Sequence, residues 1–88
     1  MKRRSVVLGA AGFLGSHLVD ALLDGGNSVI GVDDLSSGSI RNIAHLKGVR
    51  NFEFIQQDIN ENINVSGPVS AVFNFASLAS PQIGRAHV

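Results

Sequence analysis

Hydrophobic and polar positions follow more than one period along this chain, and the period changes at glycines. Residues 5–8 form a short apolar run that Gly9 ends, which predicts a buried strand. Over residues 13–23 the apolar positions recur every three to four residues, which predicts a helix, and Gly25-Gly26 predicts its end. The stripe expected to face the core consists of Leu14, Leu18, Ala21 and Leu22.

The rest of the chain continues this alternation. Three further apolar runs predict strands, at residues 28–32, 52–55 and 69–76. A loop and a short helix that closes near Gly48 are expected between the first two of these strands, whereas residues 60–66 are polar and predicted to be irregular. Strands that alternate with helices imply an α/β fold, in which a parallel sheet is built with right-handed crossovers.

The composition excludes several classes of protein. The 88 residues suffice for one small domain or for a piece of a larger one. Seven Lys and Arg residues balance seven Asp and Glu residues, so neither nucleic acid nor a membrane surface is expected as a partner. The chain contains no Cys, which removes disulfides, thiolate metal sites and cysteine nucleophiles, and its three His residues show no pattern of metal ligands.

The first eleven residues resemble a twin-arginine export signal, because paired arginines precede an apolar stretch. A signal would need a small-residue cleavage site after that stretch, but the chain continues into the helical pattern at Ser16 and His17. No apolar run is long enough to cross a bilayer. We therefore expect a cytoplasmic protein. Export is the alternative, which cell fractionation would test.

A glycine-rich turn lies between the first predicted strand and the helix. Its glycines follow the spacing Gly-x-x-Gly-x-x-Gly: Gly9 allows the tight turn, Gly12 allows a phosphate to approach the backbone, and Gly15 allows close helix packing. Phe13 and Leu14 are expected to present backbone N–H groups to the phosphates while their side chains enter the core. The pattern predicts a dinucleotide pyrophosphate site, and the alternative is a strand–helix turn without a ligand.

An acidic residue closes the second predicted strand. A carboxylate at Asp33 can accept hydrogen bonds from both hydroxyls of the adenosine ribose and would repel a 2′-phosphate, so NAD is favoured over NADP. Asp34 either contacts the ribose or caps the loop. Arg41 is the one nearby cation that would argue for NADP, and a solvated helix position is the favoured interpretation.

Four motifs follow one another along residues 6 to about 81, at residues 7–19, 32–38, 58–59 and 72–77. Together they resemble the extended short-chain dehydrogenase/reductase family, the nucleotide-sugar epimerases and dehydratases. The resemblance implies the N-terminal part of a Rossmann fold, truncated after the fourth strand. Residues 76–81 are most similar to UDP-glucuronate decarboxylases, with epimerases and 4,6-dehydratases left open.

The resemblance implies further contacts with NAD. Asp58 would bind the adenine amino group, unless it only caps the following turn, and Ile59 would contribute its backbone. Ser37 and Gly38 would lie beside the adenosine ribose. Three residues would line the nicotinamide half of the cofactor, namely Phe75, which could instead belong only to the core, Ala76 and Ser77.

The family's chemistry begins with hydride transfer from the sugar C4 to NAD, after a Tyr assisted by a Lys four residues later removes the hydroxyl proton. This chain contains no Tyr, so it supplies no catalytic residue and is expected to be inactive alone. The longer protein is expected to be a homodimeric enzyme acting on a nucleotide sugar. The alternative is a non-catalytic NAD(P)-binding sensor or scaffold protein of the same fold.

The end of the chain differs from what precedes it. Residues 1–81 are expected to form a partial NAD-binding domain with one apolar sheet face left exposed, and so with marginal stability. Residues 82–88 (Gln-Ile-Gly-Arg-Ala-His-Val) fit no expected element and resemble the translation of a common sequencing-library adapter. We therefore expect this heptapeptide to be non-native and exclude it from fold reasoning.

Overall fold

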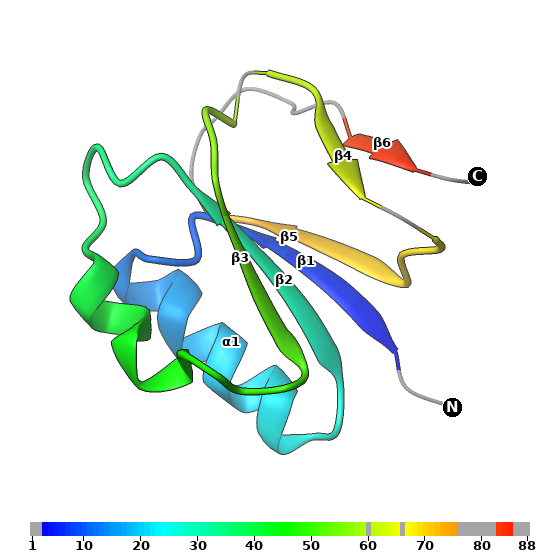
Figure 1. Ribbon diagram of the computed structural model, residues 1–88, viewed down its shortest axis with the longest axis horizontal. Coiled ribbons are helices and arrows are strands. Elements are labelled where there is room, and N and C mark those ends of the chain that lie inside the picture. The colour runs from blue at the N-terminus through cyan, green and yellow to red at the C-terminus, as the bar shows by residue number, and fades with distance from the viewer. Residues whose placement is uncertain (1–2, 60, 66, 76–82, 86–88) are drawn as a thin grey trace.

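A four-stranded parallel sheet forms the centre of the computed structural model, which describes residues 3–59, 61–65, 67–75 and 83–85 (Figure 1). The order of the strands across the sheet is β3-β2-β1-β5, and every neighbouring pair is parallel. This confirms the predicted α/β fold with strand–helix alternation. The strands are β1 (Arg4–Leu8), β2 (Ser28–Asp33), β3 (Phe52–Gln56) and β5 (Ala71–Asn74), the last shorter than the predicted residues 69–76.

The register of the sheet brings the carboxyl ends of its strands to one edge. Leu8 at the end of β1 lies opposite Val32 of β2 and Asn74 of β5. The backbone N–H groups of Gly9 and Ala10 both donate to the carbonyl of Val32, at 2.8 and 3.2 Å. The glycine turn is therefore attached directly to the end of the second strand, at the edge where open α/β sheets bind ligands.

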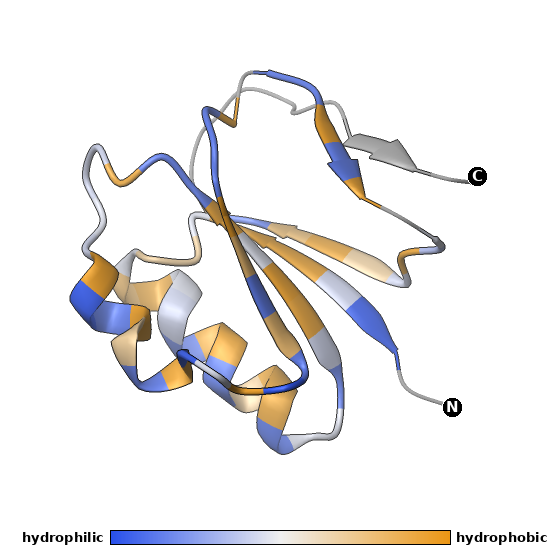
Figure 2. Ribbon diagram, in the orientation of Figure 1, coloured by the Kyte–Doolittle hydropathy of each residue, from blue (hydrophilic) through white to orange (hydrophobic). Residues whose placement is uncertain are grey.

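One face of the sheet is covered by the helix α1 (Phe13–Asp24) and the 3₁₀ helix η1 (Ile40–Leu46), as Figure 1 shows. Figure 2 shows apolar positions concentrated along the central strands and alternating with polar positions along the two helices. Of the predicted stripe of α1, Leu18 and Leu22 pack against the core, whereas Leu14 and Ala21 are exposed. The buried residues of α1 are Gly15, Ser16 and Val19, with Leu18, Leu22 and Leu23 packed against the same cluster.

The opposite face of the sheet is covered by the segment that follows β3. Residues 60–66 were predicted to be irregular, but Ile63–Val65 form the short strand β4, in which Ile63 is fully buried. Its partner β6 (Ile83–Arg85) runs parallel to it. The expectation of an exposed apolar face was therefore wrong over β1 and β2, whereas Val72 of β5, on the same face, is 42% exposed. The core on this side contains Val6, Leu8, Ile30, Val32, Ile59, Ile63 and Val65.

The last seven residues were predicted to fit no element, whereas the structure assigns three of them, Ile83–Arg85, to β6. The further prediction that residues 82–88 are non-native stays a prediction. Within the part of the chain that the structure describes, neither helix has the length and apolar character needed to span a bilayer.

Candidate functional site

A small polar hollow of about 160 Å³ lies at the edge where the strands end. It collects residues from the glycine turn, the end of β2 and its following loop, the segment after β3, and the residue after β5. Ser36 is the one lining residue that the sequence did not predict. The lining consists of Gly9, Gly12, Asp33, Asp34, Ser36, Ser37, Gly38, Asp58, Ile59 and Phe75.

The glycine turn has a geometry that larger residues would disrupt. Gly9 has φ +83°, a left-handed conformation that glycine adopts without steric cost. A Cβ at Gly15 would lie 2.0 Å from the carbonyl oxygen of Gly9, so α1 can approach the end of β1 only with glycine at this position. A Cβ at Gly12 would lie 3.3 Å from the same oxygen. The spacing predicted these roles for Gly9 and Gly15.

No side chain caps the first turn of α1. Gly12 is the N-cap residue, no side chain accepts a hydrogen bond there, and the first turn contains no acidic residue. The first helical hydrogen bond runs from Ser16 N–H to Gly12 C=O. Within the described residues, the N–H groups of Phe13, Leu14 and Gly15 have no hydrogen-bond partner. Uncapped N–H groups and the positive end of the helix dipole favour a bound anion at this point.

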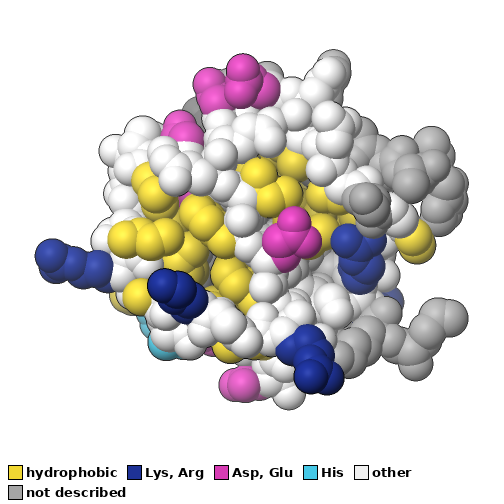
Figure 3. All heavy atoms as spheres, viewed as in Figure 1, with side chains coloured by type: hydrophobic (Ala, Val, Ile, Leu, Met, Phe, Trp, Pro, Cys, Tyr) yellow, Lys and Arg dark blue, Asp and Glu magenta, His cyan; other side chains and the backbone are white. Residues whose placement is uncertain are grey.

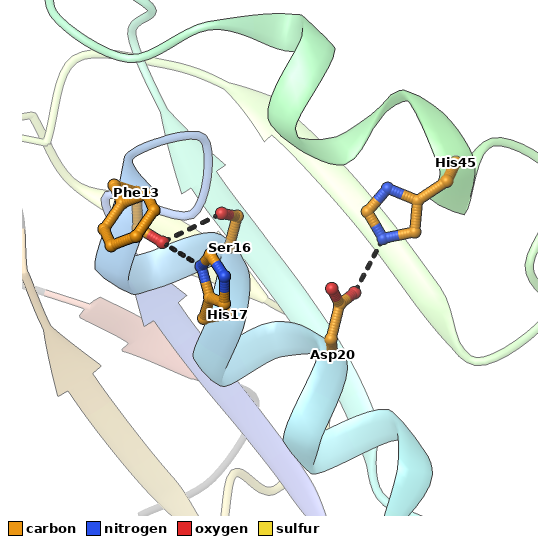
Figure 4. A network of polar contacts seen from close by, with 5 residues as sticks. All are labelled: Phe13, Ser16, His17, Asp20 and His45. Atoms are coloured by element: carbon orange, nitrogen blue, oxygen red, sulfur yellow. Dashed lines mark hydrogen bonds and ion pairs between the residues drawn. The ribbon is translucent and has the colours of Figure 1, made fainter.

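The side chains of Phe13 and Leu14 do not enter the core, contrary to the prediction. Phe13 is 71% exposed and Leu14 is 63% exposed. The close contact between Gly15 and Gly9 turns a different side of α1 toward the sheet, so the two preceding residues face outward. The Phe13 ring instead lies beside the ring of His17 (Figure 4), and their centroids are 4.5 Å apart.

Asp33 is buried, with 6% of its surface exposed, and its carboxylate contacts two backbone groups. Oδ2 accepts a hydrogen bond from Ala11 N–H at 2.9 Å, and Oδ1 accepts one from Leu35 N–H at 2.8 Å. Leu35 has φ +65°, which is uncommon for a residue with a branched side chain. Asp33 therefore links the glycine turn to a strained loop. A carboxylate has about four lone-pair sites, so about two remain for a ligand.

Asp34 and Ser36 form a local turn at the rim of the hollow. Asp34 Oδ1 accepts hydrogen bonds from the backbone N–H and from the hydroxyl of Ser36, at 2.9 and 2.7 Å. These bonds, the backbone one foremost, hold the pKa of the Asp34 carboxyl below its ordinary value. The spacing Asp-x-Ser is a known turn signal and could have indicated Ser36. The capping role that the sequence allowed for Asp34 is thus present in the structure.

The other predicted residues divide into those that line the hollow and those that do not. Gly38 lies so close to the turn that a Cβ there would be 2.8 Å from the carbonyl carbon of Ala11. Phe75 is half exposed and donates its backbone N–H to Leu8 C=O at 2.9 Å. Arg41 is exposed on η1 and is not part of the lining. Ala76 and Ser77 lie outside the described residues.

The two described histidines take part in surface contacts (Figure 4). His17 Nδ1 lies 2.7 Å from the carbonyl oxygen of Phe13, and His45 Nε2 on η1 lies 2.8 Å from Asp20 Oδ1 on α1. The latter pair joins the two helices on the same face of the sheet. Among the described residues, no group of three or more His, Asp or Glu side chains could hold a metal ion.

A second hollow, of about 330 Å³, is larger and apolar. It lies beside η1 and β3, where Figure 3 shows hydrophobic side chains gathered on the surface. It brings no group of polar atoms together, so the polar hollow at the ends of the strands is the candidate functional site. The apolar hollow is lined by Ile40, Ile43, Ala44, Leu46, Lys47, Gly48, Phe52 and Phe54.

A family model and individual proteins of known sequence both match this chain. Residues 6–82 match the family model described as GDP-mannose 4,6 dehydratase. UDP-glucuronic acid decarboxylase 1 of Danio rerio is 40% identical over 80 residues, which make up 91% of this chain and 19% of that protein. UDP-glucose 4-epimerase of Mycolicibacterium smegmatis is 52% identical over 56 residues, or 64% of this chain and 18% of that protein. The chain thus spans about a fifth of the length of these relatives.

Solved structures of epimerases share the fold. The UDP-glucose 4-epimerase of Thermotoga maritima, determined with UDP-glucose, matches with a TM-score of 0.63 and 35% identity, covering 88% of this chain and 25% of that one. The UDP-glucose 4-epimerase of Thermus thermophilus, determined in complex with NAD, matches with a TM-score of 0.60 and 28% identity over the same shares of the two chains, 88% and 25%.

Proposed function

Because the chain belongs to the NAD-dependent epimerase/dehydratase family, as its match to the GDP-mannose 4,6 dehydratase model over residues 6–82 shows, we propose that it is the NAD-binding portion of a nucleotide-sugar-modifying enzyme. The observation that carries the proposal is the polar hollow itself. There an uncapped helix N-terminus and the buried carboxylate of Asp33 meet at the carboxyl ends of parallel strands. Anion-binding N–H groups beside a ribose-binding carboxylate match the two polar parts of an adenosine diphosphate.

The residues present fit the adenosine half of NAD. The free N–H groups of Phe13, Leu14 and Gly15 would hold the pyrophosphate, which the absence of a side chain at Gly12 allows to approach. The lone pairs that Asp33 retains would accept the ribose hydroxyls. Ser37 and Gly38 would border that ribose on the other side.

The remaining lining residues would hold the two ends of the cofactor. Asp58 would accept a hydrogen bond from the adenine amino group, and Ile59 would contribute its backbone beside it. Phe75 would border the nicotinamide half, and the family resemblance implies the same role for Ala76 and Ser77. When bound, NAD supplies a nicotinamide ring that accepts a hydride and later returns it.

We propose that the longer protein acts on a nucleotide sugar by transient hydride transfer from the sugar C4. UDP-glucuronate decarboxylation is favoured because the similarity to UDP-glucuronic acid decarboxylases extends over 91% of the chain. Related epimerases and 4,6-dehydratases belong to the same proposal. This chain has no Tyr to remove the hydroxyl proton of the sugar, so it contributes cofactor binding and no catalytic residue.

Titration of the chain with NAD and NADP by isothermal calorimetry tests the proposal. NAD should bind at least about tenfold more tightly than NADP, because the Asp33 carboxylate repels a 2′-phosphate. A tenfold difference in affinity corresponds to ~1.4 kcal/mol. A variant that removes a carboxylate far from the hollow, Asp24→Asn at the other end of α1, should keep the wild-type preference for NAD. Equal or tighter binding of NADP would contradict the role of Asp33, and a folded chain that binds neither nucleotide would overturn the proposal.

A further inference from the structure

Both backbone polar groups of Ala11, in the middle of the glycine turn, are hydrogen-bonded to residues that lie more than twenty positions further along the chain. Its N–H donates to Asp33 Oδ2 at 2.9 Å. Its carbonyl oxygen accepts two hydrogen bonds, one from the Ser39 backbone N–H at 3.0 Å and one from the Asn42 side-chain amide at 2.7 Å. Ala11 itself is fully buried. The turn is thus fixed from outside as well as by its own backbone.

We propose that Asn42 is a positioning residue for NAD, acting through Ala11. This inference rests on the proposed function, because it assigns Asn42 to the same cofactor site without direct contact with the cofactor. Asn42 does not line the hollow. It belongs to η1, a helix that the sequence suggested only from its apolar positions, and its contact with the turn joins residues 31 positions apart.

The packing of η1 fixes where the Asn42 amide lies. Ile43 and Leu46 anchor the helix, with 4% and 6% of their surfaces exposed. At its start the Ser39 hydroxyl caps the helix by accepting a hydrogen bond from the Arg41 N–H at 3.2 Å. Near its end the contact between His45 and Asp20 joins it to α1 (Figure 4). A helix that is capped at its start, and that is joined to the rest of the molecule by its buried residues and by α1, presents the amide of Asn42 in one place, which is the condition for a positioning role.

The planar peptide bond carries the effect of Asn42 to the ligand-binding end of the turn. Because the Ala11 carbonyl and the Gly12 nitrogen belong to one rigid unit, fixing the carbonyl also fixes the orientation of Gly12, the N-cap of α1. The free N–H groups begin at the next residue, Phe13. Preorganised donors bind an anion more tightly than donors that must be ordered on binding. Without Asn42, Ala11 keeps its bond with Ser39, so NAD affinity should fall without being lost.

Variants of Asn42 test the inference, with Asn27 as a matched control. The Asn27 amide donates to Leu22 C=O at 2.9 Å and is partly buried like that of Asn42, but it lies at the far end of α1. Asn42→Ala and Asn27→Ala should lower the urea midpoint to a similar extent. Only Asn42→Ala should weaken NAD binding, by about threefold to tenfold, the range expected for one lost hydrogen bond.

Two further variants separate the hydrogen bond from the packing of the side chain. Asn42→Asp has nearly the same shape but cannot donate to a carbonyl while ionised, so it should weaken NAD binding at least as much as Asn42→Ala. Asn42→Gln retains the donor and should recover part of the affinity. These two variants also keep the test decisive should Asn42→Ala fail to fold.

The outcomes separate this inference from the proposed function. A folded wild-type chain that does not bind NAD would overturn the proposed function and this inference with it. Wild-type affinity in Asn42→Ala and Asn42→Asp, or an equal loss of affinity in Asn27→Ala, would overturn the positioning role alone. Calorimetric titration with NAD and urea unfolding of the same preparations provide both readouts.

Discussion

At the scale of single residues, Asp33 combines a structural and a proposed binding role in one carboxylate. The sequence suggested the ribose contact from the position of Asp33 at the end of a strand. It could not suggest the bonds with Ala11 and Leu35, because these depend on how the glycine turn and the loop pack against each other. Removing the charge should therefore affect folding as well as cofactor preference.

Asp33→Asn is expected to lower the free energy of unfolding by about 1–3 kcal/mol, the cost of an unsatisfied buried polar group. The amide oxygen can replace one acceptor, but the NH₂ group then faces a backbone N–H and cannot accept from it. Urea unfolding followed by circular dichroism measures the change. Asp34→Asn is the control and should cost less, because its partners Ser36 N–H and Oγ lie at the surface. Equal losses in the two variants would contradict the structural role of Asp33.

At the scale of elements, the periodicity of apolar positions predicted the helices and strands that local sequence determines. The strands of the central sheet and the helix after the glycine turn were found because their apolar runs are long or regular. β4 was missed because a strand of three residues is too short to show a period, and the burial of Ile63 and Val65 comes from packing against β1 and β2. The outward positions of Phe13 and Leu14 were missed for a similar reason, since the approach of Gly15 to Gly9 decides which side of α1 is buried.

The same distinction applies to the candidate site. Glycine spacing, the position of Asp33 at the end of β2 and the family resemblance predicted most of the residues that line the hollow. Ser36 was not predicted, although the Asp-x-Ser spacing is a local turn signal. Asn42 has no local signal, because the contact of Asn42 with Ala11 joins distant parts of the chain. Side chains that act through long-range contacts with backbone groups are therefore the part of a site that a single sequence leaves undetermined.

The packing of α1 on β1 should depend on Gly15. Gly15→Ala would place a Cβ 2.0 Å from Gly9 O and 2.8 Å from Gly9 C, both backbone atoms, so the helix must move outward. We expect a loss of about 3 kcal/mol or more in the free energy of unfolding, at or above the upper end of overpacking costs. Thermal and urea unfolding measure this loss.

Gly25→Ala serves as the control for Gly15→Ala. Gly25 is the C-cap residue of the same helix and has φ −79°, and a Cβ there would meet its nearest atom at 3.4 Å, an ordinary contact. Its stability should stay within about 0.5 kcal/mol of wild type. A Gly15→Ala variant as stable as Gly25→Ala would show that α1 does not depend on this close approach.

At the scale of the whole molecule, the two faces of the sheet are covered by different means. α1 and η1 cover one face, and the short β4 covers the part of the other face over β1 and β2. Ile59, which lines the hollow, belongs to the same apolar cluster as Ile63 of β4. The side chains that cover the second face of the sheet therefore belong to the same cluster as a residue that lines the candidate site.

Ile63→Ala tests whether this cover stabilises the molecule. Ile63 is fully buried, so its truncation should lower the free energy of unfolding by about 2–5 kcal/mol, the sum of lost burial and a residual cavity. Val72→Ala is the matched control: Val72 lies opposite Val6 in the register, on the same face, but it is 42% exposed and should cost less than about 1 kcal/mol. Because Ile59 packs in the cluster that loses Ile63, NAD affinity should fall in Ile63→Ala and not in Val72→Ala. Similar small losses of stability in both variants would mean that β4 contributes little to closing this face, and that the sheet is stabilised mainly from the side of α1.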